Sequence, residues 1–183
     1  MSITVTITTT ANRTRRFTQT DEACIQGLLD TLGRVGQLFS NRTLIIGSGQ
    51  ETEIFSPSSI TRIEIETTRD LSTCLPLHGE TQLTLIPAGS PTPVTEVSET
   101  VFSGQVDFFF EGGDSVSIWM SGPRPSGTNE RLMRLTRLFE QPVLMYNLPA
   151  GGIGLMNPNA MTRALIAATP EQLPAGSWML NPA

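Results

Sequence analysis

The sequence predicts a protein of the α+β class, built from two tandem β-β-α-β-β-β units in which one helix covers each antiparallel sheet. Three observations support this prediction. Short runs of apolar residues alternate with threonines, which is typical of half-buried strands. Two segments carry apolar residues at spacings of three and four, as amphipathic helices do. Parts of the chain also recur after about one hundred residues, which indicates an internal repeat.

The repeat consists of two blocks. Residues 32–44 (LGRVGQLFSNRTL) align with residues 132–144 (LMRLTRLFEQPVL), and residues 57–68 (PSSITRIEIETT) align with residues 158–169 (PNAMTRALIAAT). Ten of the twenty-five aligned positions are identical. One residue inserted in the Gly-rich region between the blocks keeps them in step, and an insertion in such a turn costs little. We interpret the repeat as an internal duplication. The alternative is that two helix–strand units converged on similar patterns.

The first unit, residues 1–69, opens with a predicted hairpin. The run ITVTITT predicts a half-buried strand, and the run RTRRFT after a short ANR turn predicts its partner. TLIIG and TEIFS predict a second hairpin around Gly47 and Gly49. ITRIEIET predicts the last strand of the unit.

A helix is expected between these two hairpins, over residues 21–39. Thr20 offers a hydroxyl N-cap, and the acids Asp21 and Glu22 suit the positive end of the helix dipole. The apolar stripe of the helix consists of Cys24, Ile25, Leu28, Leu32, Val35 and Phe39. Three glycines weaken the helix by about 1 kcal/mol each relative to alanine, so tertiary packing must hold it.

Residues 70–101 are expected to connect the two units. One strand is predicted at Gln82–Ile86, and a Pro-, Gly- and Ser-rich run follows it. Because that run has the composition of a linker, we place the boundary between the units here.

The second unit, residues 102–169, repeats the order of the first. QVDFFFEGGDSVSIWMS predicts a hairpin that turns at Gly112 and Gly113. Thr128 is the expected N-cap of a helix over residues 129–139. VLMYN and IGLMN predict a further hairpin through the LPAGG turn.

The end of the second unit gives conflicting signals. Residues 158–169 are rich in helix-favouring residues, whereas the aligned residues 57–68 predict a strand. We follow the alignment and expect a strand, with a helix as the alternative. The proline-rich tail, residues 170–183, is expected to pack on the second unit through Trp178 and Met179.

Composition limits the possible functions. The chain has 183 residues and a formal net charge of −5, and all twelve basic residues are arginines. An acidic chain is not expected to be a general nucleic-acid binder, although an acidic net charge is compatible with a local basic patch. No apolar run is long enough to span a bilayer, and the N-terminal run MSITVTITTT lacks the features of a signal peptide. These observations favour a cytoplasmic location without a membrane partner.

The second unit is more apolar than the first. Six of the seven methionines lie between residues 120 and 179, and the outward-facing Glu64 and Glu66 of the first unit become Leu165 and Ala167 in the second. A Met-rich core is the simpler interpretation. Our main hypothesis is a non-enzymatic assembly or protein-interaction module that binds itself or another protein. The expected contact residues are Tyr146, Met156, Met161, Leu165 and Trp178.

Recurring arginines give the alternative hypothesis, a binder of nucleic acid or an anionic small ligand between the two halves. The candidate anion-binding residues are Arg34, Arg62, Arg131, Arg134, Arg137 and Arg163. A solvated helix face with internal ion pairs is the simpler interpretation of the three arginines between residues 131 and 137.

Patterns for catalysis or metal binding are weak. Cys74 and His78 could pair to activate a thiolate, but the intervening LPL is not helical in character and does not bring them together. Two cysteines and one histidine fall short of a typical zinc site. Glu64 and Glu66 share one face of a strand and could hold a divalent ion, although a solvated face is simpler. We expect no metal, no cofactor and no enzymatic activity.

Overall fold

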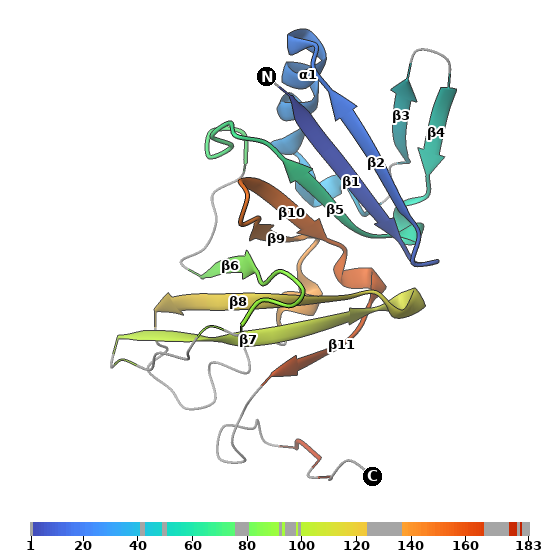
Figure 1. Cartoon of the computed structure of the whole chain (residues 1–183). Helices are drawn as coiled ribbons and strands as arrows, with labels where there is room; N and C mark the ends of the chain where they lie inside the picture. The colour runs from blue at the N-terminus through green and yellow to red at the C-terminus, as the bar shows by residue number, and fades with distance from the viewer. Residues whose placement is uncertain are drawn as a thin grey trace.

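A computed structural model shows the fold of the chain (Figure 1). It describes residues 2–40, 43–48, 51–75, 81–91, 93, 98, 100–123, 137–166, 176–178 and 180. Within these residues the chain forms one α-helix and eleven strands, arranged as a nine-stranded sheet and a separate two-stranded sheet. The mixture of helix and largely antiparallel sheet agrees with the α+β class expected from the sequence.

The strands fall into two groups of five with one strand between them. The N-terminal half contains β1 (Ile3–Thr9), β2 (Thr14–Gln19), β3 (Leu44–Ser48), β4 (Glu51–Phe55) and β5 (Ile60–Glu66). The strand β6 (Gln82–Leu85) follows it. The C-terminal half contains β7 (Val101–Phe110), β8 (Ser115–Pro123), β9 (Leu144–Asn147), β10 (Gly152–Met156) and β11 (Met161–Ile166). All eleven strands overlap strands expected from the sequence. Alternation and turn residues predicted the first ten, although β7 begins at Val101, four residues before the expected Gln105, and the aligned repeat predicted β11.

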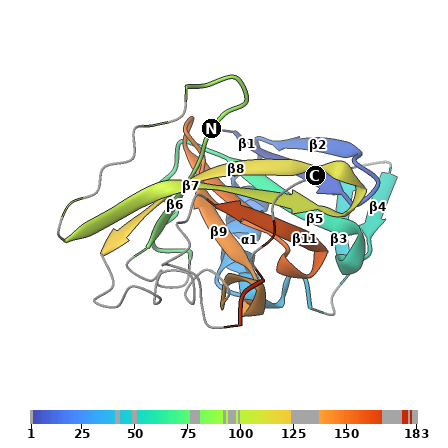
Figure 2. The same ribbon diagram turned by 90° about the horizontal axis from the view of Figure 1, so that it is seen from below.

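Strands of both halves join in one sheet, whereas the sequence predicted a separate sheet for each unit. The strand order is β11-β7-β8-β6-β9-β10-β5-β1-β2, and only β3 and β4 stay apart. The strands turn strongly across the sheet, so that β1 and β2 run at a steep angle to β7 and β8 (Figure 1). Figure 2 views the molecule from the side where β11 ends the sheet. The sheets merge because the hairpin β9–β10 pairs with β5.

The pairing of β10 with β5 forms the seam between the two halves. It is antiparallel and runs from Gly152 opposite Glu66 to Met156 opposite Arg62. One face of the hairpin packs in the N-terminal core, where Leu155 is fully buried. The other face packs in the C-terminal core. The hairpin β9–β10 therefore belongs to both cores.

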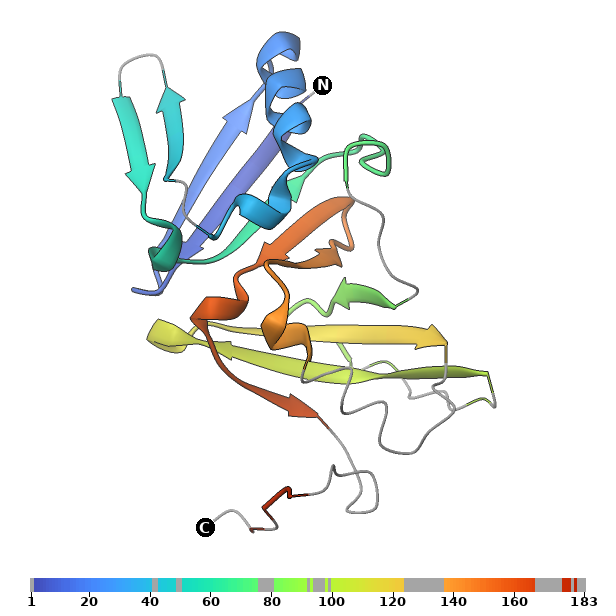
Figure 3. The same ribbon diagram turned by 180° about the vertical axis from the view of Figure 1, so that it is seen from behind.

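The helix α1 (Glu22–Leu32) packs on the strands of the N-terminal half, as Figure 3 shows from behind. Its N-cap is Asp21 rather than the expected Thr20, because an Asp21 carboxylate oxygen accepts a hydrogen bond from the backbone N–H of Cys24 at 2.9 Å. That hydrogen bond lowers the pKa of Asp21. The helix also ends at Leu32, well before the expected Phe39, with Gly33 as its C-cap.

Short 3-10 helices complete the described elements. They are η1 (Val35–Gln37), η2 (Pro57–Ser59), η3 (Glu111–Gly113), η4 (Arg137–Glu140) and η5 (Pro158–Ala160). Residues 129–136 of the expected second helix lie outside the described residues, and its end forms part of η4. The disputed segment after Asn157 is η5 followed by β11, so the expectation of a strand is confirmed for residues 161–166.

The two halves share one pattern of strand pairing. In the N-terminal half β1 pairs with β2 and β5, and in the C-terminal half β7 pairs with β8 and β11. The registers are equivalent, since Thr8 lies opposite Arg62 and Phe109 lies opposite Arg163. A register shift follows at the same place in both pairs.

Side chains at this register shift repeat one hydrogen bond. Thr61 Oγ1 donates to the carbonyl of Thr8 at 3.0 Å, and Thr162 Oγ1 donates to the carbonyl of Phe109 at 3.1 Å. At these positions the alignment of residues 57–68 with residues 158–169 therefore pairs residues that occupy the same place in the strand register.

Equivalent positions in the two hairpins predict different responses to truncation. Leu155 is 0% exposed, whereas Ile54, its equivalent in β4, is 65% exposed. Leu155→Ala should lower the free energy of unfolding by about 3 kcal/mol because it leaves a cavity. Ile54→Ala should change it by less than about 0.5 kcal/mol. Urea unfolding of both variants in dilute solution measures the difference. Equal losses of unfolding free energy would contradict the burial of Leu155 at the pairing of β10 with β5.

Candidate functional site

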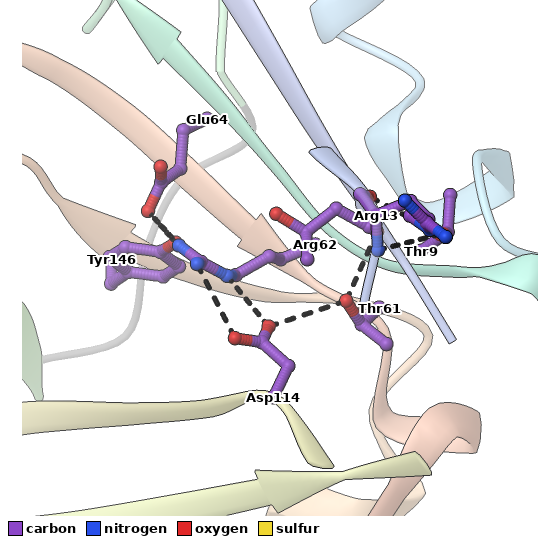
Figure 4. Close-up of polar contacts among 8 residues, drawn as sticks. Thr9, Arg13, Thr61, Arg62, Glu64, Asp114 and Tyr146 are labelled. Carbon is purple, nitrogen blue, oxygen red and sulfur yellow. Dashed lines mark hydrogen bonds and ion pairs between the residues drawn. The ribbon is translucent and has the colours of Figure 1, made fainter. Parts of the chain in front are cut away.

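A group of polar side chains lies at the seam between the two halves. We call Arg62, Glu64, Asp114 and Tyr146 the seam cluster (Figure 4). Arg62 and Glu64 lie on β5, Tyr146 on β9 and Asp114 in the turn between β7 and β8. Figure 4 shows the Arg62 guanidinium between Asp114 on one side and Glu64 with Tyr146 on the other. The cluster therefore joins residues far apart in the sequence.

Strand alternation and one glycine position these side chains. Arg62 and Glu64 are two residues apart, so they share the face of β5 that points away from the N-terminal core. Gly154 lies between Glu64 and Tyr146 in the sheet, as the cross-strand partner of both. A Cβ atom on Gly154 would lie 1.9 Å from Cζ of Tyr146. The absence of a side chain therefore lets the tyrosine ring cross β10.

Charged hydrogen bonds hold the cluster together. Arg62 Nε donates to Asp114 Oδ2 at 2.9 Å, and Arg62 Nη1 donates to Glu64 Oε1. The Tyr146 hydroxyl donates to the same Glu64 oxygen at 2.9 Å. The side chains of all four residues are largely buried. The geometry satisfies each charge with a partner of opposite sign or a hydrogen bond, as partly buried charges require.

Two pKa values in the cluster move away from the neutral range. Burial alone would lower the pKa of Arg62, but the hydrogen bond to Asp114 and the charges of Glu64 and Asp114 outweigh it and raise that pKa. Burial, reinforced by the charge of Glu64, raises the pKa of Tyr146 although Arg62 acts against it. The guanidinium thus stays charged and the phenol stays protonated near neutral pH. Such an arrangement suits a structural role better than proton transfer.

The structure places the predicted anion-binding arginines in different surroundings. Arg62 is bonded to two carboxylates in the seam cluster. Its equivalent, Arg163, lies exposed on β11, where its guanidinium carbon is 4.0 Å from the centroid of the Phe109 ring. Arg34 is exposed after α1, and Arg137 is exposed at the start of η4. The remaining two, Arg131 and Arg134, lie outside the described residues.

The predicted apolar contact residues divide into buried and exposed ones. Tyr146 and Met156 are buried in the C-terminal core. Met161 is half-buried against that core. Leu165 on β11 is 54% exposed, and Trp178 in the tail is 86% exposed. A partner can therefore contact Leu165, Met161 and Trp178, but not the buried Tyr146 and Met156.

The remaining sequence candidates are Cys74 with His78, and Glu64 with Glu66. Cys24 is exposed, and its hydrogen bond with Asp21 raises the pKa of its thiol. Cys74 is half-buried, and His78 lies outside the described residues. Glu64 belongs to the seam cluster, whereas Glu66 pairs with Arg16.

The described part of the chain contains neither a candidate metal site nor a candidate membrane span. No group of three or more His, Cys, Asp or Glu side chains there could hold a metal ion. The helices described there are too short or too polar to cross a membrane.

Sequence reasoning missed two residues of the site, Asp114 and Gly154. Asp114 follows the EGG turn, where an acidic residue has an ordinary role in the turn itself. Gly154 lies within the predicted strand IGLMN, beside the Gly-rich LPAGG turn. A glycine inside a strand signals a close approach of another group, and this signal could have identified Gly154.

Removal of Arg62 should destabilise the chain more than removal of its equivalent, Arg163. Arg62→Ala leaves two largely buried carboxylates without their cation and should lower the free energy of unfolding by about 3 kcal/mol. Arg163→Ala removes an exposed cation–π contact and should cost about 0.5–1 kcal/mol. Urea unfolding of both variants compares the losses. A larger loss for Arg163→Ala would show that the seam cluster does not contribute as proposed.

A methyl group at Gly154 should disturb the seam, whereas one at Gly104 should not. Gly154→Ala forces the Tyr146 ring to move, and overpacking of this kind costs about 1–3 kcal/mol. Gly104 lies on β7 with no atom within 4 Å of an added Cβ, so Gly104→Ala is the matched control. Thermal unfolding followed by circular dichroism measures both. Equal melting temperatures would be incompatible with the observed position of the ring.

Comparisons with known proteins give no relative for this chain. No protein-family model matches it, and neither a curated protein nor a solved structure matches it. A function must therefore be inferred from the residues of the chain itself.

Proposed function

We propose that this chain is a non-enzymatic assembly or protein-interaction module whose contact surface is centred on β11. The supporting observation is the open outer edge of this strand. β11 ends the nine-stranded sheet and pairs with β7 on one side, with no strand on its other side among the described residues. Residues 162–165 are exposed, including the apolar Leu165. An open, apolar edge strand is a template for pairing with another strand.

The opposite edge of the sheet has the protection that β11 lacks. On β2, Arg15 pairs with Glu53 and Arg16 pairs with Glu66. Charged side chains of this kind discourage pairing between edges. β11 carries a single charged residue, Arg163, which lies over the Phe109 ring. This contrast supports β11 as the strand that meets a partner.

A tandem duplication of one ancestral unit, which we also infer, is consistent with this proposal. It accounts for the equivalent registers of β1–β5 and β7–β11, and for the repeated threonine hydrogen bond. Under duplication, β11 is the equivalent of β5, whose outer edge pairs with β10. By this equivalence, the outer edge of β11 corresponds to an edge of β5 that accepts a neighbouring strand.

Anion binding by the recurring arginines, the alternative from the sequence, has less support. The guanidinium of Arg62 already has Glu64 and Asp114 as partners. An incoming phosphate would have to displace a carboxylate from a largely buried site. An interaction surface on β11 needs no such displacement.

A charge introduced on β11 should weaken association. We expect the mean mass of the wild-type chain in light scattering to rise with concentration above that of one chain. Leu165→Glu should reduce this rise because it buries a carboxylate against the partner. Val101→Glu introduces the same charge at another exposed apolar position, on β7, and should behave like the wild type. Association of Leu165→Glu as strong as that of the wild type would rule out β11 as the contact surface.

A further inference from the structure

The hairpins β3–β4 and β9–β10 have equivalent registers. Each packs the equivalent face on the core of its own half of the chain. Leu44 lies opposite Phe55 in the first hairpin, and Leu144 lies opposite Met156 in the second. Each hairpin packs one face on the core of its own half. For β3–β4 the packed residues are Leu44, Ile46 and Phe55. For β9–β10 they are Leu144, Tyr146 and Met156.

The opposite faces of the two hairpins differ sharply in burial. On β9–β10, Met145 and Leu155 pack in the core of the other half of the chain, and Leu155 is fully buried. Their equivalents on β3–β4 are Ile45 and Ile54, which lie opposite each other across the hairpin. These two isoleucines are 62% and 65% exposed. The first hairpin thus exposes the face that the second hairpin buries at the seam.

The edges that accept these hairpins differ in the same way. β5 accepts β10 along its outer edge, whereas the equivalent edge of β11 carries no strand within the described residues. Among the described residues, the β3–β4 hairpin therefore has no edge strand to pair with, and the outer edge of β11 has no hairpin. Figures 1 and 3 show β3–β4 and β11 at opposite ends of the molecule. The hairpin of one chain cannot reach the β11 edge of that same chain in this fold.

We propose that the β3–β4 hairpin of one copy pairs with the β11 edge of a second copy, as β10 pairs with β5 within the chain. This inference rests on the proposed function and names its partner as a further copy of the same chain. The internal seam supplies the register, because Leu155 lies opposite Ile63 and Ile153 lies opposite Ile65. By equivalence, Ile54 lies opposite Ala164 in the contact between copies, and Thr52 lies opposite Ile166.

The chemistry of the two surfaces is complementary in this register. The backbone groups along β4 and β11 complete a hydrogen-bonded ladder, which lies beside the apolar contact of the hairpin face. Ile45 and Ile54 leave the solvent, and the small Ala164 leaves room for the branched side chain opposite it. Glu53 lies opposite Leu165, so a carboxylate at position 165 would meet a like charge.

The contact is head-to-tail, because it joins two different surfaces of identical chains. Such contacts close into rings or continue as filaments. A symmetric dimer in which two β11 strands pair with each other would instead leave Ile45 and Ile54 exposed. Whether assembly requires Ile45 and Ile54 therefore distinguishes the head-to-tail contact from the symmetric dimer.

Two complementary variants test the contact. The hairpin variant carries Ile45→Glu and Ile54→Glu, and the edge variant carries Ala164→Glu and Leu165→Glu. All four positions are exposed, so neither variant should unfold. Each variant alone should remain a single chain in sedimentation velocity at concentrations where the wild type assembles. An equal mixture should form a dimer of one chain of each, because one intact hairpin then meets one intact edge. Val101→Glu is the charge control and should assemble like the wild type.

The outcomes separate this inference from the proposed function. If the edge variant stays a single chain but the hairpin variant assembles, β11 is the contact surface and the inference is wrong. If neither variant changes assembly, both proposals are wrong. If the wild type stays a single chain at every concentration, the inference is wrong and β11 can serve only a different protein.

Disulfide trapping tests the register. In a background of Cys24→Ser and Cys74→Ser, one chain carries Ile54→Cys and the other carries Ala164→Cys. Mixing and oxidation should give a covalent heterodimer, because cross-strand partners lie close enough for a disulfide. Replacing Ala164→Cys with Leu165→Cys moves the thiol to the opposite face of β11 and should abolish the product. Equal yields from the two mixtures would overturn the register.

Discussion

The antiparallel pairing of β10 with β5 is the interaction on which the rest of the structure depends. It makes one sheet from strands of both halves and inserts Leu155 into the N-terminal core. It also brings Tyr146 beside Glu64, so that the seam cluster can form. A slip of one residue would turn Arg62 and Glu64 toward the apolar face, so burial on that face fixes the register.

Local patterns predicted the strands but not their arrangement. Alternation and turn residues identified the first ten strands, and the aligned repeat correctly favoured a strand at residues 161–166 over the helix that composition suggested. The joining of the sheets was not predictable, because the choice of β5 as the partner of β10 depends on tertiary packing rather than on either strand alone. The end of α1 at Leu32 was also not predictable from the apolar pattern, because that pattern continues to Phe39. The glycines after Leu32 are poor helix formers, and they ended the helix earlier.

The candidate site was predictable only in part. Leu165 was expected on the exposed surface from its position opposite the inward residues of its strand, and the structure places it there. Tyr146 and Met156 carried the same Met and aromatic signal, yet they lie in the core. Composition does not distinguish a core from a contact surface, because both favour large apolar side chains. The ion pair of Arg62 with Asp114 joins residues of different halves, and no spacing in the sequence indicates it.

Tyr146 is the only tyrosine of the chain, and its phenol is buried where the two halves meet. Burial and the nearby Glu64 raise the pKa of this phenol. The resulting stabilisation is fully present below the ordinary tyrosine pKa of about 10 and is lost as the pH rises through the raised value. Tyrosinate absorbs ultraviolet light differently from the protonated phenol. An alkaline titration therefore gives an optical signal from a single tyrosine, which records the ionisation of the phenol at the junction between the halves.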